Sequence, residues 1–114
     1  MVGLEDLDSL SFSTVKRLLE RICKSLGFRL FHCPISFAPV YICWHLDAGD
    51  VRNAVFLEGH NRDDFRTAKD LLRGILAVKA FKLRSLDTGE EKIIPNPFCG
   101  LDISALKIKL DLLA

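Results

Sequence analysis

Four residues between positions 32 and 45 carry side chains of the kinds that bind zinc: His32, Cys33, Cys43 and His45. The segments on either side of Pro34 and Pro39 read as strands, so a hairpin around residues 34–39 would pair them. In that register Cys33 lies opposite Val40, which places Cys33 and Cys43 on opposite faces of the sheet. We therefore expect no zinc, no other metal and no cofactor.

Catalytic chemistry finds as little support in the residue pattern. Cys43 and His45 share one strand face, where a base could activate a thiol, but no third group is placed to orient them. Asp47, Asp50 and Glu58 are carboxylates on or beside neighbouring strands, of the kind that hold Mg²⁺ in nucleases. Such sites usually carry a lysine two residues after the strand carboxylate, and here that position is His60. The sequence predicts no catalytic residue and a protein that is not an enzyme.

A basic stripe follows from the spacing of residues 61–77. Apolar side chains recur there at helical intervals, which predicts a helix with Asn61 as its N-cap and Phe65, Ala68, Leu72 and Ile75 on its buried face. The opposite face carries Arg62, Arg66, Lys69 and Arg73. Such a stripe could follow a phosphate backbone, so nucleic-acid binding is one alternative function. Interleaved aspartates and a net charge of +1 favour a solvated helix face with ion pairs instead.

The 114 residues are enough for one packed domain, residues 1–114, in which residues 1–10 form either a packed flap or an arm. Hydrophobic residues make up 49% of the chain, too many for a disordered protein. The uncharged run from Leu30 to Leu46 contains two prolines and two histidines, so we do not expect a membrane span. Four cysteines without paired spacing and the lack of a signal peptide favour an intracellular location, cytoplasmic or nuclear.

The remaining pattern predicts the elements that must position these side chains. A helix covers Ser11–Leu26, with Ser11 as N-cap and Gly27 at its end. Strands are expected at residues 28–33, 40–46, 51–58, 78–86 and 92–94, and a hairpin turn at Asp87–Glu90 has Gly89 at the position of positive φ. Predicted core residues are Val40, Ile42, Trp44, Leu46, Phe65, Leu72 and Ile75.

The last element has two readings. Leu106, Ile108, Leu110 and Leu112 alternate with polar residues, which favours a strand. Ile103, Leu106, Leu110 and Leu113 also fit a helix that begins after Asp102. We favour the strand. The fold class is therefore α+β, a largely antiparallel sheet of five to six strands covered by two helices, in the order α-β-β-β-α-β-β followed by β or α.

A domain with two helices and one sheet hides only a limited apolar surface, and this chain has eight phenylalanines. The surplus should lie on a surface shared with another copy or with a partner protein. We expect that surface at Phe28, Leu30 and Phe31, on a strand apolar on both faces, together with the four basic residues of the stripe. The sequence thus predicts a non-enzymatic interaction module (an adapter, regulator or chaperone-like protein) that forms a homodimer or higher oligomer.

The stretch Leu18–Phe28 leading into strands, and Leu101-Asp102 leading into spaced leucines, are similar to the small dimeric chaperones of bacterial type III secretion. Those chaperones also run helix, three strands, helix, two strands, helix, so the resemblance covers most of the chain and implies a chaperone-like dimer. Two features depart from that family. The chaperones are typically acidic, whereas this chain has a net charge of +1, and the alternation at residues 106–112 differs from their final helix.

Overall fold

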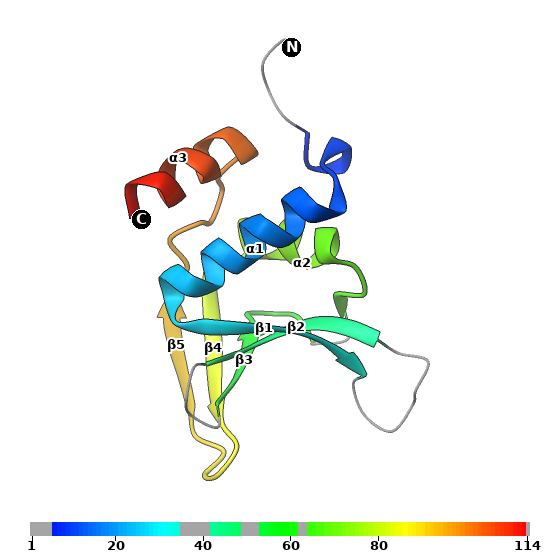
Figure 1. The fold of residues 1–114 in the computed structure, drawn as a ribbon. Coiled ribbons are helices and arrows are strands. Elements are labelled where there is room, and N and C mark those ends of the chain that lie inside the picture. The colour runs from blue at the N-terminus through cyan, green and yellow to red at the C-terminus, as the bar shows by residue number, and fades with distance from the viewer. Residues whose placement is uncertain (1–5, 35–41, 49–52, 62–63, 114) are drawn as a thin grey trace.

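The computed structural model describes residues 6–34, 42–48, 53–61 and 64–113 (Figure 1). These residues form three α-helices and a five-stranded antiparallel sheet, which confirms the α+β class. The elements are, in order, η1 Leu7–Ser9, α1 Phe12–Leu26, β1 Phe28–Pro34, β2 Ile42–Ala48, β3 Asn53–Leu57, α2 Ala68–Ala77, β4 Ala80–Ser85, β5 Glu91–Pro95 and α3 Ile103–Leu113. The strands stand in the sheet in chain order, from β1 at one edge to β5 at the other.

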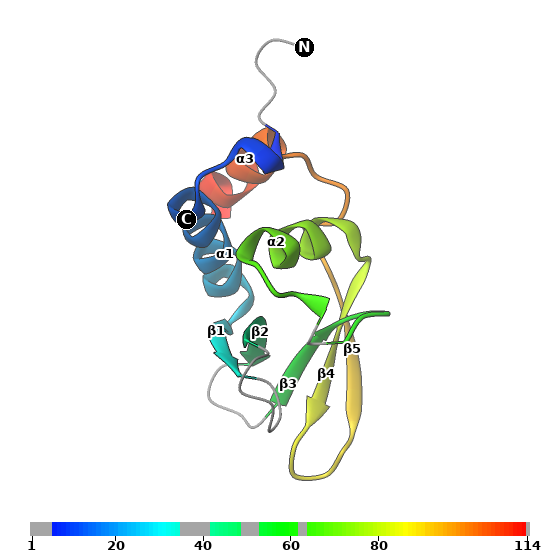
Figure 2. The same ribbon diagram turned by 90° about the vertical axis from the view of Figure 1, so that its right-hand side faces the viewer.

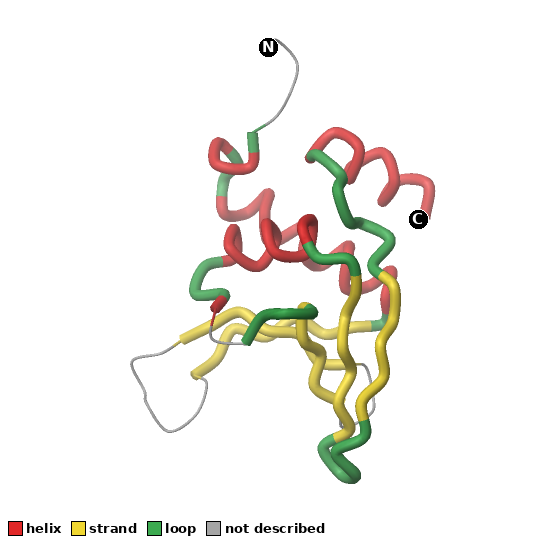
Figure 3. Tube along the Cα trace, turned by 180° about the vertical axis from the view of Figure 1, so that it is seen from behind, coloured by secondary structure: helices red, strands yellow, loops and turns green. Residues whose placement is uncertain are grey.

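The helices lie on one side of the sheet. α1 and α2 pack side by side over it, and α3 packs against α1 on the side away from the strands (Figures 1 and 2). Seen from behind, the helices again occupy one half of the molecule and the strands the other (Figure 3). β1 and β2 run across the view in Figure 1 whereas β4 and β5 run nearly vertically, so the sheet is strongly twisted.

Local signals placed the first helix and the last hairpin correctly. The Ser11 hydroxyl accepts a hydrogen bond from the Thr14 backbone N–H at 3.2 Å, and Gly27 ends α1 with a φ of 75°. Gly89, in the turn between β4 and β5, has a φ of 73°. These observations confirm the three predictions. The sequence could make them because each role depends only on residues within one turn of its own position.

The predicted start of the second helix is wrong. α2 begins at Ala68 and its N-cap is Thr67, whose hydroxyl accepts from the Asp70 backbone N–H at 3.0 Å. The segment before it is used differently, because the Phe65 carbonyl accepts a hydrogen bond from the Trp44 backbone N–H of β2 at 2.8 Å. Phe65 is buried, as predicted, but it enters the core from this connecting segment. Asn61 therefore does not cap α2.

The preference for a C-terminal strand is also wrong, since Ile103–Leu113 form α3. Asp102 stabilises its first turn by accepting from the Ala105 backbone N–H at 2.7 Å. Of the side chains that fit the helical reading, Ile103, Leu106 and Leu110 are buried, whereas Leu113 in the last turn is 55% exposed. Ile108 and Leu112, which the strand reading would place beside Leu106, are exposed. α3 carries apolar side chains on both its buried and its exposed face. Together they occupy every second position from Leu106 to Leu112, which is also the pattern of a strand.

The core lies between the sheet and the helices, and its described members confirm most of the predicted set. Trp44, Leu46, Phe65, Leu72 and Ile75 are buried. Val40 and the side chain of Ile42 lie outside the described residues. One polar side chain is buried with them: the Asn96 amide donates to the carbonyls of Ile75 and Val78 at 2.6 and 2.8 Å and accepts from the Phe98 N–H at 2.9 Å. It ties the end of α2 to the chain leading to α3.

Candidate partner-binding groove

The pairing of β1 with β2 overturns the register expected for the cysteine and histidine cluster. Cys33 lies opposite Cys43, not opposite Val40, because pairing begins at Pro34 and Ile42 and leaves a longer connection. Directly opposed residues of an antiparallel pair belong to the same face, so the predicted separation of the two cysteines is wrong. The side chains of Cys33, Cys43 and His45 lie outside the described part. His32 is described, and its ring stacks on Trp44.

No group of three or more His, Cys, Asp or Glu side chains suited to a metal ion is found among the described residues. Of the carboxylates considered for Mg²⁺, the two that the structure describes, Asp47 and Glu58, do not converge. Asp47 of β2 lies opposite Ala54 of β3, and Glu58 follows Ala54 by four residues. At the rise of a strand, those four residues separate Glu58 from the level of Asp47 by about 13 Å. Asp50 lies outside the described residues. The absence of zinc stays a prediction, to be checked by elemental analysis of the purified protein.

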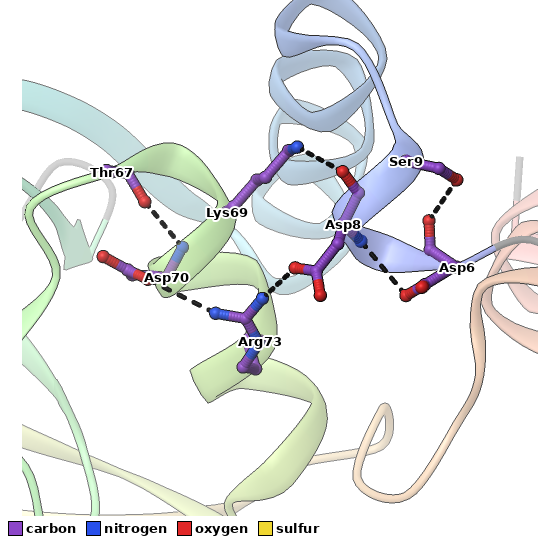
Figure 4. A network of polar contacts seen from close by, with 7 residues as sticks. All are labelled: Asp6, Asp8, Ser9, Thr67, Lys69, Asp70 and Arg73. Carbon is purple, nitrogen blue, oxygen red and sulfur yellow. Dashed lines mark hydrogen bonds and ion pairs between the residues drawn. The ribbon is translucent and has the colours of Figure 1, made fainter.

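The basic stripe is not continuous in the structure. Lys69 and Arg73 lie on α2, Arg66 precedes that helix, and Arg62 lies outside the described residues. Lys69 and Arg73 both contact η1 (Figure 4): Lys69 Nζ donates to the Asp8 carbonyl at 2.8 Å, and Arg73 forms an ion pair with the Asp8 carboxylate. Arg73 also pairs with Asp70 of its own helix. The contacts with Asp8 hold residues 6–10 against α2, as a packed flap would be held.

A concave surface lies between α1 and β1 and encloses about 830 Å³. β1 is an edge strand: in the described sheet it pairs with β2 on one side and with no strand on the other. Figure 2 shows β1 at that edge, beneath α1. We call this surface the α1–β1 groove. Its lining residues are Phe12, Lys16, Glu20, Cys23 and Lys24 of α1, residues 28–32 of β1, and Trp44 of β2.

Helical spacing explains why these α1 residues form one wall. Positions 12, 16, 20 and 23 follow each other at three or four residues, so they lie on one side of α1. That side is adjacent to the buried stripe of Val15, Leu19 and Ile22, which packs on the core. In the strands, Phe28 and Leu30 of β1 face the helices, as do Leu46 and Trp44 of β2, which lie opposite Leu30 and His32. The groove therefore borders the core.

One end of the α1–β1 groove is aromatic. The rings of His32 and Trp44 are stacked, with centroids 4.2 Å apart and an interplanar angle of 7°. Phe12 lies against the same Trp44, with a centroid distance of 6.0 Å, and is nevertheless 60% exposed. A large phenyl ring that is mostly exposed beside a concave surface offers apolar area that an apolar group could cover.

The other end is basic. Lys24 and Arg29 line it, and within the described part of the chain no carboxylate forms an ion pair with either one. Glu20 is the acidic residue of the lining, and its carboxylate lies 3.9 Å from Lys16 Nζ. Three cationic side chains and one carboxylate leave the groove with an excess of positive charge.

Cys23 is the thiol of the groove, and its environment makes it unreactive. Burial raises the pKa of the Cys23 thiol to about 12, and the Glu20 carboxylate adds to the shift. The neutral thiol is a poor nucleophile and a poor metal ligand at neutral pH. The groove thus offers aromatic, aliphatic and cationic groups suited to binding.

The residues predicted as a partner surface divide into two sets. Phe28, Leu30 and Phe31 all line the α1–β1 groove; Phe28 is largely buried, with its ring edge-to-face on Phe81 at 5.4 Å, while the other two are half-buried. Arg66, Lys69 and Arg73 are not among its lining residues, and Arg62 lies outside the described residues. The sequence analysis did not identify Phe12. It lies four residues before Lys16 and off the buried stripe of α1, and a large apolar residue at such a position indicates an exposed contact surface.

Comparisons with protein-family models, with curated protein sequences and with solved structures find no match for this chain. Among its described helices, none is long and apolar enough to cross a membrane.

Proposed function

We propose that this chain is a non-enzymatic protein-interaction module, which binds an extended segment of a partner protein in the α1–β1 groove. The observation that carries the proposal is the coincidence of an edge strand with that groove. An edge strand directs alternate backbone N–H and C=O groups away from the sheet, where an added strand can pair with them. The groove gives the side chains of such a strand a wall to pack against.

Its dimensions fit this mode of binding. The groove follows β1 over residues 28–32, and an added strand at about 3.3 Å per residue would need about five residues to match it. Main-chain hydrogen bonds supply affinity in strand addition, and alternate side chains supply specificity. An aromatic end and an unpaired basic end are features by which partners could be distinguished.

A chaperone-like role is the second form of the proposal. The order α-β-β-β-α-β-β-α now ends in a helix, as in the type III secretion chaperones that the sequence resembles. This agreement of element order supports a partner that is bound while extended, as a secretion substrate would be. The nucleic-acid alternative has less support, because the continuous helical stripe on which it was based is absent from α2.

The proposal is tested by selecting ligands and locating them. A random library of displayed 12-residue peptides is selected on the immobilised protein, and amide hydrogen exchange is then followed by NMR with and without a selected peptide. We expect slower exchange for backbone amides of β1, because strand addition protects them from water.

β5, the opposite edge of the same sheet, is the internal control, since its amides should not change. Protection confined to β5 or to α3 would locate the ligand elsewhere and refute the groove. Failure to select any peptide with an affinity better than about 1 mM would argue against a peptide-binding module altogether.

A further inference from the structure

We infer that the partner segment is acidic at one end and aromatic at the other. This inference rests on the proposed function and specifies its ligand. The two ends of the α1–β1 groove differ in chemistry: Lys24 and Arg29 form the basic end, and Phe12, His32 and Trp44 form the aromatic end. A ligand that complements both ends must carry both kinds of group.

The basic end favours carboxylates for two reasons. Lys24 and Arg29 have no ion-pair partner among the described residues, so a ligand carboxylate would not have to displace one. Glu20, the acidic residue of the lining, already lies beside Lys16. Arg29 has Asp47 directly opposite it in the β1–β2 register, whereas covering Lys24 with an apolar or basic segment would remove its charge from water without compensation. An aspartate or glutamate supplies that compensation and forms charge-assisted hydrogen bonds.

The aromatic end favours a ring on the ligand. Phe12 and His32 are exposed members of the cluster, and the buried Trp44 ring lies against Phe12 with centroids 6.0 Å apart. A ligand Phe, Tyr or Trp placed against Phe12 would bury apolar surface on both partners. Offset or edge-to-face ring pairs add about 0.5–1.5 kcal/mol to that burial.

The separation of the two ends sets the spacing of the motif. Phe12 and Lys24 are twelve residues apart on α1, which is about 18 Å along the helix axis. An extended chain covers that distance in about five to six residues. The partner segment therefore carries its acidic residue five or six positions from its aromatic residue, and the order of the two depends on whether the added strand is parallel or antiparallel to β1.

The test uses synthetic peptides on a Thr/Val scaffold, with a Phe near one end and two Asp residues five and six positions away. Both sequence orders are made, and dissociation constants are measured by fluorescence anisotropy at physiological ionic strength. We expect one order to bind, with at least about tenfold weaker binding when the two Asp residues become Lys or when the Phe becomes Ala.

Charge reversal in the protein provides the matched experiment. Lys24→Glu with Arg29→Glu should weaken the Asp peptide and strengthen the Lys peptide, reversing the preference. The control is Arg17→Glu with Lys92→Glu, which makes the same change of charge on an exposed face of α1 and on the other edge strand, and should leave the preference intact.

The outcomes separate this inference from the proposed function. If the peptides protect β1 amides from exchange but the Asp and Lys versions bind equally, the groove stands and the acidic–aromatic motif is refuted. If the control variant reverses the preference as strongly as the groove variant does, general charge rather than the basic end is responsible, and the motif is again refuted. If no peptide protects β1, the groove and the motif fail together.

Discussion

Gly74 shows how a single residue can work against its local preference. It lies inside α2, where alanine would favour the helix by about 1 kcal/mol. A Cβ atom at this position would lie 2.7 Å from Phe65 Cε1 and 2.8 Å from Leu57 Cδ2. Both neighbours are buried, so neither side chain has free space to move into. The glycine allows α2 to approach the sheet closely.

We therefore expect Gly74→Ala to lower the free energy of unfolding by about 1–3 kcal/mol, the usual cost of overpacking. Urea denaturation measures it. In a chain that also carries Phe65→Leu, the same substitution should cost less, because the smaller side chain leaves room for the added methyl group. A Gly74→Ala protein more stable than the wild type would show that helix propensity outweighs the close contact.

The structural role of a single residue was predictable from the sequence only where its partners are near in the chain. Ser11, Gly27 and Gly89 act within one turn of themselves, and all three were identified. Gly74 is constrained by Leu57 and Phe65, and Asn96 bonds to Ile75 and Val78. Those partners come from other elements, so nothing in the adjacent sequence announces either role.

At the scale of elements, α3 offers a direct test of the two readings of its sequence. A strand would place Leu106 and Leu112 on the same face, and their truncations would then cost similar amounts. In α3, Leu106 is 0% exposed and Leu112 is 80% exposed. We expect Leu106→Ala to destabilise the fold by about 2–5 kcal/mol and Leu112→Ala to change it by less than about 0.5 kcal/mol. Thermal or urea unfolding gives both values, and equal costs would contradict the helix.

The wrong register of β1 and β2 has a comparable cause. The prolines at 34 and 39 suggested a tight hairpin, but pairing starts at Pro34 and Ile42. An odd shift in register exchanges the two faces of a strand, so one misjudged connection reversed the relation of Cys33 to Cys43. Only one wall of the α1–β1 groove was predicted. Phe28, Leu30 and Phe31 were identified from the pattern of their own strand, whereas the other wall comes from α1, whose place beside β1 the sequence pattern did not indicate.

At the scale of the whole molecule, self-association stays a prediction, and α3 now suggests where it occurs. The apolar side chains of Ile108, Leu112 and Leu113 in that helix are largely exposed. A second copy related by two-fold symmetry could cover them, and a stable contact should bury at least about 1,000 Å² in total.

Light scattering over a dilution series should give twice the chain mass, and Ile108→Glu with Leu112→Glu should return the protein to a monomer. A wild-type particle of single-chain mass at high micromolar concentration would contradict the dimer. The α1–β1 groove could still bind its partner in that case, since none of its lining residues belongs to α3.

The packing of α3 on α1 has a consequence for the order of folding. Every neighbouring pair of strands in the sheet is consecutive in the chain, so the sheet can assemble through short-range steps. α3 instead docks on α1 across nearly the whole sequence, as the 2.7 Å contact between Arg21 Nη2 and Asp111 Oδ1 illustrates over a separation of 90 residues. Closing so long a loop carries an entropic cost, so we expect this docking to follow the folding transition state. Leu106→Ala should therefore accelerate unfolding while leaving the refolding rate almost unchanged.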